Sequence, residues 1–175
     1  RGCGGKAAGR DRKRCLSVIL WRIAAETRKY AADDLGGAGA AKSPGRWNDE
    51  GQPAVYAAPT IAMAVLETAA HVDDAGLPLN KYLVRILVPD KIWAARVVLD
   101  VARLPVTWAS IPAGRASVQA GSDWLRSLSS ALLEVPSVIV PEESAVVVNP
   151  MHPEARQLTA KSIRLFEYNR LFRGA

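Results

Sequence analysis

Short runs of β-branched and aromatic residues recur along this chain, and they constrain its fold more than any other feature. Runs of this kind, bounded by turn residues, are typical of β-strands. We expect strands at residues 17–23, 54–58, 82–89, 97–101, 136–141, 145–150 and 163–168. They do not alternate with helices in the rhythm of βαβ units. The sequence therefore predicts an α+β fold with a largely antiparallel sheet and a few helices.

Two helices are expected between these strands. The first begins after Thr60, whose hydroxyl is suited to the N-cap position. The second begins near Gly121, with Ser122 or Asp123 as its cap, and runs to about Leu133. With 175 residues and no long linker, the sequence predicts a single domain over residues 16–175.

The net charge of +6 is concentrated in the first fifteen residues. That segment, residues 1–15, is rich in glycine, and it carries one acidic residue and the basic residues Arg1, Lys6, Arg10, Arg12, Lys13 and Arg14. The composition predicts a disordered basic tail. The rest of the chain is nearly neutral and has no basic stripe with interleaved aromatic residues, so we expect no direct nucleic-acid binding by the folded domain.

The two cysteines, Cys3 and Cys15, both lie in this tail. They form neither a metal-ligand set nor a disulfide framework, which favours a reducing, cytoplasmic location and a fold without a bound metal. No apolar run approaches the roughly 18 residues of a membrane span, so no membrane association is expected.

The candidate site lies between Ser43 and His71. Arg46 follows a Pro-Gly turn signal, Tyr56 lies in a short apolar run, and Glu67 interrupts an otherwise apolar helix. An isolated helical glutamate is usually solvated, but the neighbours of Glu67 are mostly alanine, methionine and leucine. An arginine, an aromatic ring and a carboxylate can together hold an anionic ligand that contains a ring.

Two other features near this stretch have an open interpretation. Arg22 lies inside the first strand, either as an edge residue whose stem covers apolar surface or as a guanidinium directed into a cleft. The glycine-rich residues 36–41 form either a mobile loop or a substrate-side lid, and they match no phosphate-binding motif. The histidines, His71 and His152, form no Ser-His-Asp set, and His152 is interpreted as a turn residue.

Several of these motifs together resemble the RES-domain family, toxins of bacterial toxin–antitoxin pairs that consume NAD or transfer ADP-ribose. The resemblance runs from about Leu20 to Pro153. It is carried by a strand with Trp-Arg, Gly-Arg-Trp-Asn, Gly-x-Pro-x-x-Tyr-Ala-Ala, a helical Glu, Gly-x-Asp-Trp-Leu, Val-Pro-Ser and Asn-Pro-x-His-Pro.

The resemblance implies a fold like that of the ADP-ribosyltransferase toxins, NAD as substrate and a helix-turn-helix antitoxin as partner. It implies Arg46, Tyr56 and Glu67 as catalytic residues, and Arg22, Arg46, Tyr56 and Ser137 as substrate-binding residues. We therefore expect a toxin that cleaves the nicotinamide–ribose bond and transfers ADP-ribose to a target, which could be a host protein. The alternative within the family is an NAD glycohydrolase or NAD phosphorylase.

The residue types suit this chemistry. Cleavage at the ribose builds positive charge on the sugar, as in glycoside hydrolysis, and a carboxylate such as Glu67 stabilises that charge. A guanidinium such as Arg46 or Arg22 binds phosphate oxygens in a planar fork, and Tyr56 can stack on a ring of NAD. Two other classes remain open: a non-catalytic nucleotide-binding module with an Arg46–Glu67 ion pair, and a nucleic-acid binder that uses the tail.

Overall fold

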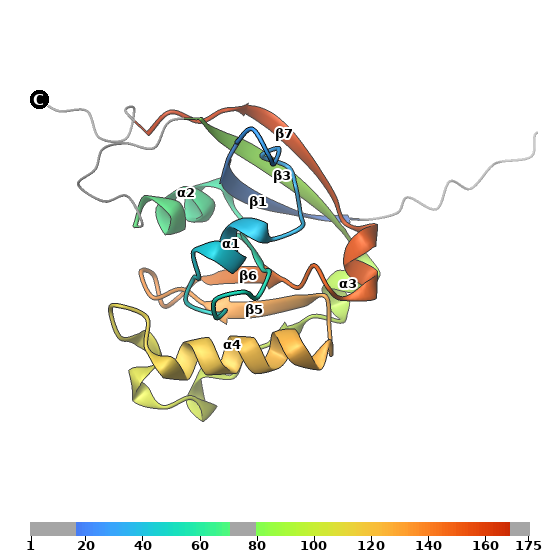
Figure 1. Cartoon of the computed structure of the whole chain (residues 1–175). Helices are drawn as coiled ribbons and strands as arrows, with labels where there is room; N and C mark the ends of the chain where they lie inside the picture. The colour runs from blue at the N-terminus through green and yellow to red at the C-terminus, as the bar shows by residue number, and fades with distance from the viewer. Residues whose placement is uncertain (1–16, 71–79, 169–175) are drawn as a thin grey trace, which may run out of the picture.

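The computed structural model describes residues 17–70 and 80–168, and in this part of the chain the strands form two β-sheets (Figure 1). One sheet has the order β1 (Ser17–Ala25), β3 (Lys81–Pro89), β7 (Thr159–Leu165). The other has the order β2 (Val55–Ala57), β6 (Ser144–Val148), β5 (Leu132–Pro136), β4 (Val97–Val98). All neighbouring strands are antiparallel except β4 and β5. This confirms the predicted α+β fold.

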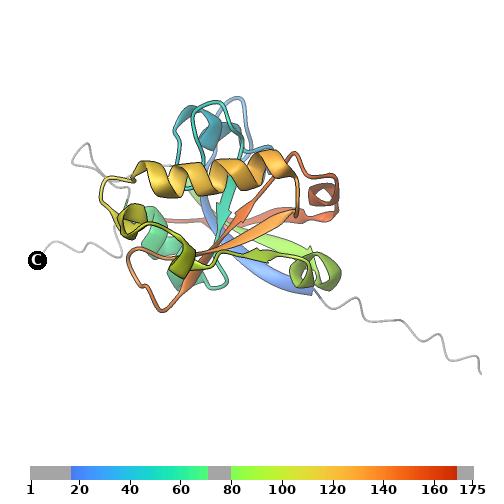
Figure 2. The ribbon, with the colours of Figure 1, turned by 90° about the horizontal axis from the view of Figure 1, so that it is seen from below.

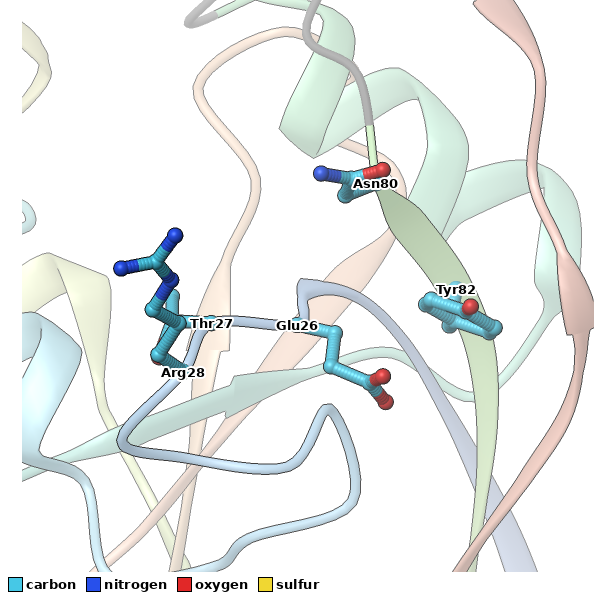
Figure 3. A pocket seen from close by; sticks show the side chains of 5 residues that line it. All are labelled: Glu26, Thr27, Arg28, Asn80 and Tyr82. Atoms are coloured by element: carbon cyan, nitrogen blue, oxygen red, sulfur yellow. The ribbon is translucent and has the colours of Figure 1, made fainter.

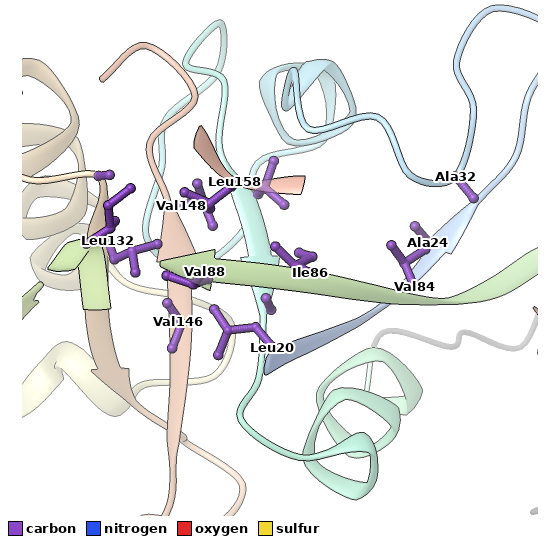
Figure 4. Packing of buried hydrophobic residues seen from close by; sticks show 14 residues of the cluster. Leu20, Ala24, Ala32, Val84, Ile86, Val88, Leu132, Val146, Val148 and Leu158 are labelled. Atoms are coloured by element: carbon purple, nitrogen blue, oxygen red, sulfur yellow. The ribbon is translucent and has the colours of Figure 1, made fainter. Parts of the chain in front are cut away.

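The main hydrophobic core lies between the two sheets (Figure 4). Side chains alternate between the faces of a strand, so alternate residues of each strand point into this layer. The three-stranded sheet contributes Leu20, Val84, Ile86 and Val88, and the four-stranded sheet contributes Val55, Leu132, Val146 and Val148.

Helix α4 (Arg115–Ser127) covers the opposite face of the four-stranded sheet (Figure 2). Its Trp124 and Leu125 pack against Leu133 of β5 and Val147 of β6. Strand β6 is thus buried on both faces, which explains why its sequence is a continuous apolar run rather than an alternating one.

Helix α2 (Ile61–Ala69) packs on the outer face of the three-stranded sheet. Its buried residues, Met63 and Ala64, contact Ile23 of β1 and Leu83 of β3. The side chain of Thr60 accepts a hydrogen bond from the backbone N–H of Met63, so the predicted N-cap is confirmed. Glu67 lies one helical turn after Met63 along α2, and its side chain is half-buried.

A backbone bridge joins the two sheets. Trp21 of β1 pairs with Ala58, which directly follows β2, through two N–H···O bonds of 2.8 Å each. Because α2 begins three residues after Ala58, this bridge also fixes where the helix that carries Glu67 starts.

Short helical segments complete the described residues: α1 (Ala38–Lys42), α3 (Asp90–Ala94), η1 (Val101–Arg103), η2 (Val106–Ala109) and η3 (Pro153–Gln157). Helix α1 forms within the glycine-rich segment that the sequence leaves as a loop. Gly37 precedes it with φ of 73°, and a Cβ atom there would lie 2.6 Å from the backbone nitrogen of Ala54. Glycine is therefore required at position 37 by both its conformation and its packing.

The second predicted helix is displaced in the structure. Helix α4 begins at Arg115 rather than near Gly121, and it ends at Ser127. Gly121 lies inside the helix because α4 approaches the backbone of Trp47 closely, where a Cβ atom would overlap the carbonyl. The C-cap residue, Leu128, adopts a left-handed conformation with φ of 50°.

Several strand boundaries also differ from the prediction. The expected strand 136–141 is wrong beyond Pro136, because β5 ends there and Ser137 begins a turn. The expected strand 97–101 is reduced to Val97–Val98, since the Asp100 side chain caps η1 instead. The last strand is Thr159–Leu165, which begins four residues and ends three residues earlier than expected. The predicted tail, the cysteines and His71 lie outside the described residues.

Candidate active site

The loop that carries Arg46 is held by Asn48, which is fully buried. The side-chain oxygen of Asn48 accepts hydrogen bonds from the Gly45 N–H at 2.9 Å and from the Tyr56 hydroxyl at 2.8 Å. Its side-chain nitrogen donates to backbone carbonyls on both sides of the loop, those of Ala40, Asp49 and Gln52. The loop therefore has one fixed conformation, anchored from within.

Tyr56 lies in the middle of β2 and points to the face of the sheet that α4 covers. It pairs with Val147 and packs at the edge of the cluster beneath α4. Its hydroxyl accepts a hydrogen bond from the Trp47 N–H at 3.0 Å. Burial raises the pKa of Tyr56 well above its usual value, against smaller opposing effects of the Trp47 N–H and the Arg46 charge, so the phenol is neutral at physiological pH.

The guanidinium of Arg46 is directed to the segment around η2. Its Nη1 donates to the carbonyl of Trp108 at 2.8 Å and to the carbonyl of Ser110 at 2.9 Å. The rings of Trp47 and Trp108 stack beside it, with centroids 6.1 Å apart. Within the described residues, Nε and Nη2 of Arg46 make no hydrogen bond, which leaves both free for an anionic ligand.

Glu67 is held by Ser137 at the end of β5. The Ser137 hydroxyl donates to Oε1 of Glu67 at 2.6 Å. The hydroxyl oxygen of Ser137 accepts hydrogen bonds from the N–H groups of Ile139 and Val140, each at 3.1 Å. Because its lone pairs receive these two donors, the hydroxyl proton of Ser137 is committed to the carboxylate of Glu67.

Arg46, Tyr56 and Glu67 lie within electrostatic reach of one another. Partial burial lowers the pKa of Arg46, and the charge of Glu67 followed by that of Tyr56 opposes this effect. The structure thus brings together residues from the 43–53 loop, β2 and α2, and Ser137 joins them from β5. Arg46 and Glu67 do not form a direct ion pair: Arg46 bonds backbone carbonyls and Glu67 bonds Ser137.

Arg22 belongs to a second cluster. It pairs in register with Val84 and lies on the inner face of its sheet, so it does not point to the solvent-facing side. Its Nη1 donates to the carbonyl of Asp34 at 3.2 Å. Burial lowers the pKa of Arg22, and the charge of Asp34 partly opposes this. Lys81 is close enough that the Arg22 charge adds to burial in lowering the pKa of Lys81.

Two glycines let the elements of the site approach closely. A Cβ atom on Gly45 would lie 2.6 Å from the ring of Tyr56, so the loop rests directly on the phenol. A Cβ atom on Gly121 of α4 would collide with the backbone of Trp47. The loop that presents Arg46 is therefore packed between β2 and α4. The sequence alone predicted no site role for Asn48, although it is the Asn of Gly-Arg-Trp-Asn, and it placed Gly121 at the start of a helix.

A cavity of about 420 Å³ lies at the ends of β1 and β3 (Figure 3). Its lining residues are Glu26, Thr27, Arg28, Asn80 and Tyr82. None of these residues belongs to the Arg46 or Glu67 group. In the described ranges, His, Cys, Asp and Glu side chains do not gather in groups of three or more that could hold a metal ion.

His152 lies directly before η3. The His152 ring accepts the Glu154 N–H through Nδ1 and caps η3, which confirms that it is a turn residue. Among the described residues, no helix has the length and apolar composition needed to cross a bilayer.

Residues 19–169 match the RES domain family. The chain belongs to this family. A relative from Sphingobium sp. (strain YBL2), named "Prs ADP-ribosylating toxin", is 49% identical over 161 residues, which cover 91% of this chain and 100% of the relative. A "Toxin Res" from Photorhabdus laumondii subsp. laumondii is 37% identical over 134 residues, covering 77% of this chain and 83% of the relative.

The fold of this RES-domain toxin also resembles a solved structure. A chain of the M. tuberculosis MbcT-MbcA toxin-antitoxin complex superimposes with a TM-score of 0.63, covering 91% of each chain at 20% identity. At this identity the likeness concerns the fold alone. The RES-domain match spans both sheets and all four groups of the site, from the loop with Arg46 to the turn with Ser137.

Proposed function

We propose that this RES-domain toxin cleaves NAD at the nicotinamide–ribose bond and transfers the ADP-ribose to a protein. The observation that carries the proposal is the pairing of Glu67 with Ser137 at 2.6 Å, in electrostatic reach of Arg46. A fixed carboxylate beside a guanidinium with free donors suits a substrate that develops positive charge at a sugar and carries negative charge at its phosphates.

Glu67 is the proposed catalytic carboxylate. As the bond to nicotinamide lengthens, the ribose acquires oxocarbenium character, and a nearby carboxylate stabilises it. The stabilisation is larger when the group is already oriented and does not have to reorganise. Ser137 supplies that orientation, because its proton is committed to Oε1 of Glu67 and its oxygen is fixed by two backbone N–H groups.

Arg46 is the proposed phosphate-binding residue. With Nη1 fixed on two carbonyls, its Nε and Nη2 form the remaining edge of the planar guanidinium, which matches a pair of phosphate oxygens. Arg22 is proposed as a further substrate-binding group because its charge is buried and, among the described residues, its hydrogen-bond partner is a backbone carbonyl. Tyr56 is proposed to contribute its ring to the site, since its hydroxyl is already bonded.

The acceptor is proposed to be a protein, and Prs is the first candidate. The Sphingobium relative, which aligns along its whole length, is named for ADP-ribosylation of Prs. Hydrolysis and phosphorolysis of NAD use the same first bond cleavage and differ only in the group that receives the ADP-ribose.

The partner is proposed to be a cognate antitoxin of the helix-turn-helix type. The M. tuberculosis neighbour was solved as a toxin-antitoxin complex, and the family resemblance implies such a pair here. Co-expression with a cognate antitoxin should give a stable complex in which NAD turnover is suppressed.

The test is product analysis after incubation of the purified chain with NAD. We expect nicotinamide release and, with purified Prs present, a mass increase of Prs by one ADP-ribose unit. Parallel reactions with phosphate alone or buffer alone distinguish phosphorolysis and hydrolysis. Nicotinamide release without labelled protein would replace transfer by one of these reactions, and the absence of nicotinamide release under all conditions would overturn the proposal.

A further inference from the structure

We propose that Asn48 is a positioning residue of the active site. It orients Arg46, and it holds the Tyr56 hydroxyl in a hydrogen bond so that this hydroxyl does not exchange a proton with the substrate. The inference rests on the proposed NAD-consuming function for its kinetic test only. Asn48 contacts no reacting group itself; it acts through the loop and the ring that its amide holds.

The orientation of the Asn48 amide follows from its partners. One end faces three backbone carbonyls, those of Ala40, Asp49 and Gln52, at 2.9, 3.1 and 3.0 Å. Carbonyls only accept hydrogen bonds, so this end is the NH2 group. The other end faces the Gly45 N–H, which only donates, so it is the oxygen. The network admits one arrangement.

This arrangement determines the direction of the Tyr56 hydroxyl. The oxygen of Asn48 can only accept, so the Tyr56 proton points to it across 2.8 Å. The Trp47 N–H occupies a lone pair of the same hydroxyl. A phenol with its proton and a lone pair both in use, and with burial favouring its neutral form, is poorly placed to exchange a proton with a substrate. Tyr56 therefore serves the site through its ring.

Arg46 is fixed by the same network. The residue before it donates its N–H to Asn48, and the residue after it donates its N–H to Tyr56. With the residues on both sides of Arg46 bonded, its backbone is restrained, and its side chain is fixed at the far end by the Trp108 and Ser110 carbonyls. A phosphate-binding guanidinium gains affinity from such preorganisation, because less conformational freedom is lost on binding.

Asparagine is the residue type that this position requires. The site needs an acceptor on one side and a donor on the other, at the reach of one methylene. A carboxylate supplies acceptors only and would face three carbonyl oxygens with negative charge, which is unfavourable in a buried position. A protonated carboxyl restores one O–H donor and one acceptor. Asn48→Asp should therefore behave as a defective variant when ionised and as a near-normal one when protonated.

The kinetic test compares Asn48→Asp with the wild type between pH 5 and pH 8. Burial and the facing carbonyls should raise the pKa of the introduced carboxyl above that of an ordinary aspartate. We expect NAD turnover, relative to the wild type at the same pH, to be reduced about tenfold or more at pH 8 and to recover to within about threefold at pH 5. The loss at pH 8 should lie mainly in KM, since Arg46 binds the phosphates.

The matched control is Gln52→Glu, which places the same new charge in the same loop. The Gln52 side chain accepts the Asp49 N–H through its oxygen, and a carboxylate can do the same. The charged residues of this loop and of α1, Lys42, Arg46, Asp49 and Glu50, are unchanged in both variants. Gln52→Glu should follow the wild-type pH profile. A recovery at low pH in both variants, or in neither, would overturn the inference.

A second measurement does not depend on any substrate. Amide hydrogen exchange of Gly45 and Trp47, corrected for the intrinsic effect of pH, reports whether their N–H groups are bonded. In Asn48→Asp at pH 8, repulsion between the carboxylate and the carbonyls of Ala40, Asp49 and Gln52 should displace the side chain from Gly45 and Tyr56. Both protection factors should therefore fall at least about tenfold at pH 8 and return at pH 5. Unchanged protection at pH 8 would reject the positioning role even if the chain consumes NAD, and a failure of NAD turnover in the wild type would leave this readout intact.

Discussion

Ser137 and Glu67 are joined by a 2.6 Å hydrogen bond across 70 positions of the chain. The serine lies at the end of β5 in one sheet, and the glutamate lies on the helix that covers the other sheet. Since the serine oxygen also accepts two backbone N–H groups, the carboxylate is tied to the backbone of a tight turn.

Glu67→Gln should abolish most NAD turnover. The amide is nearly the same size, but it lacks the negative charge that opposes the positive charge of the ribose. We expect a loss of at least about a hundredfold, comparable to the removal of one preorganised electrostatic group, with an unchanged circular dichroism spectrum. The loss of turnover is measured by the rate of nicotinamide release. Glu50→Gln, at an exposed position, is the matched control and should retain activity; near-normal turnover in folded Glu67→Gln would reject the assignment.

Ser137→Ala should reduce kcat more than it raises KM. The substitution frees Glu67 from its donor and leaves the N–H groups of Ile139 and Val140 without their acceptor. We expect about a tenfold loss in kcat and a destabilisation of about 1–2 kcal/mol. The double variant with Glu67→Gln separates the two effects on turnover. If Ser137 acts through Glu67, the double variant should be no slower than Glu67→Gln alone, whereas additive losses would indicate an independent role.

Arg46→Lys should weaken binding of NAD and of ADP-ribose. A lysine keeps the charge but cannot bond the Trp108 and Ser110 carbonyls and present a planar fork to a phosphate at the same time. We expect Kd to rise at least about tenfold in calorimetry, which corresponds to about 1.4 kcal/mol. The parallel variant Arg22→Lys tests the second cluster. An effect in Arg22→Lys alone would transfer the phosphate role from Arg46 to Arg22.

The buried phenol of Tyr56 should make stability depend on alkaline pH. Its pKa is raised in the folded chain, so above the usual tyrosine value of about 10 the unfolded state loses a proton that the folded state keeps. The contribution of Tyr56 to the free energy of unfolding should be constant near neutral pH. Above about pH 10 it should fall by up to about 1.4 kcal/mol per pH unit. The difference in urea unfolding between the wild type and Tyr56→Phe isolates this contribution. Parallel curves for both proteins would show that Tyr56 titrates normally.

Removal of residues 1–15 should leave NAD turnover and growth inhibition unchanged, within about twofold. The RES-domain match begins at residue 19, beyond this basic segment. Growth and cellular NAD would be measured after expression of the full chain, the shortened chain and Glu67→Gln without an antitoxin. Inhibition that follows the basic segment and ignores Glu67 would point to nucleic-acid binding instead.

The sequence by itself determined most of the strands and the start of the helix that carries Glu67. Runs such as residues 17–23 and 82–89 are rich in β-branched and apolar residues, which favour strands by themselves. The Thr60 hydroxyl caps a helix by accepting a hydrogen bond from the N–H of Met63, three residues further along the chain. The same local motifs carried the family resemblance. Secondary structure that depends on such local interactions can be predicted from the sequence, because the residues that interact are close together in the chain.

Only the tertiary structure decided the contacts that build the site. Gly121 looks like a helix start in the sequence, but it lies within α4 because the backbone of Trp47 passes too close for any side chain. Ser137 looks like a strand residue in the sequence, but its hydroxyl bonds Glu67, which is 70 positions away in the chain. The roles of Asn48 and Ser137 depend on partners from other elements, which come together only when the sheets pack.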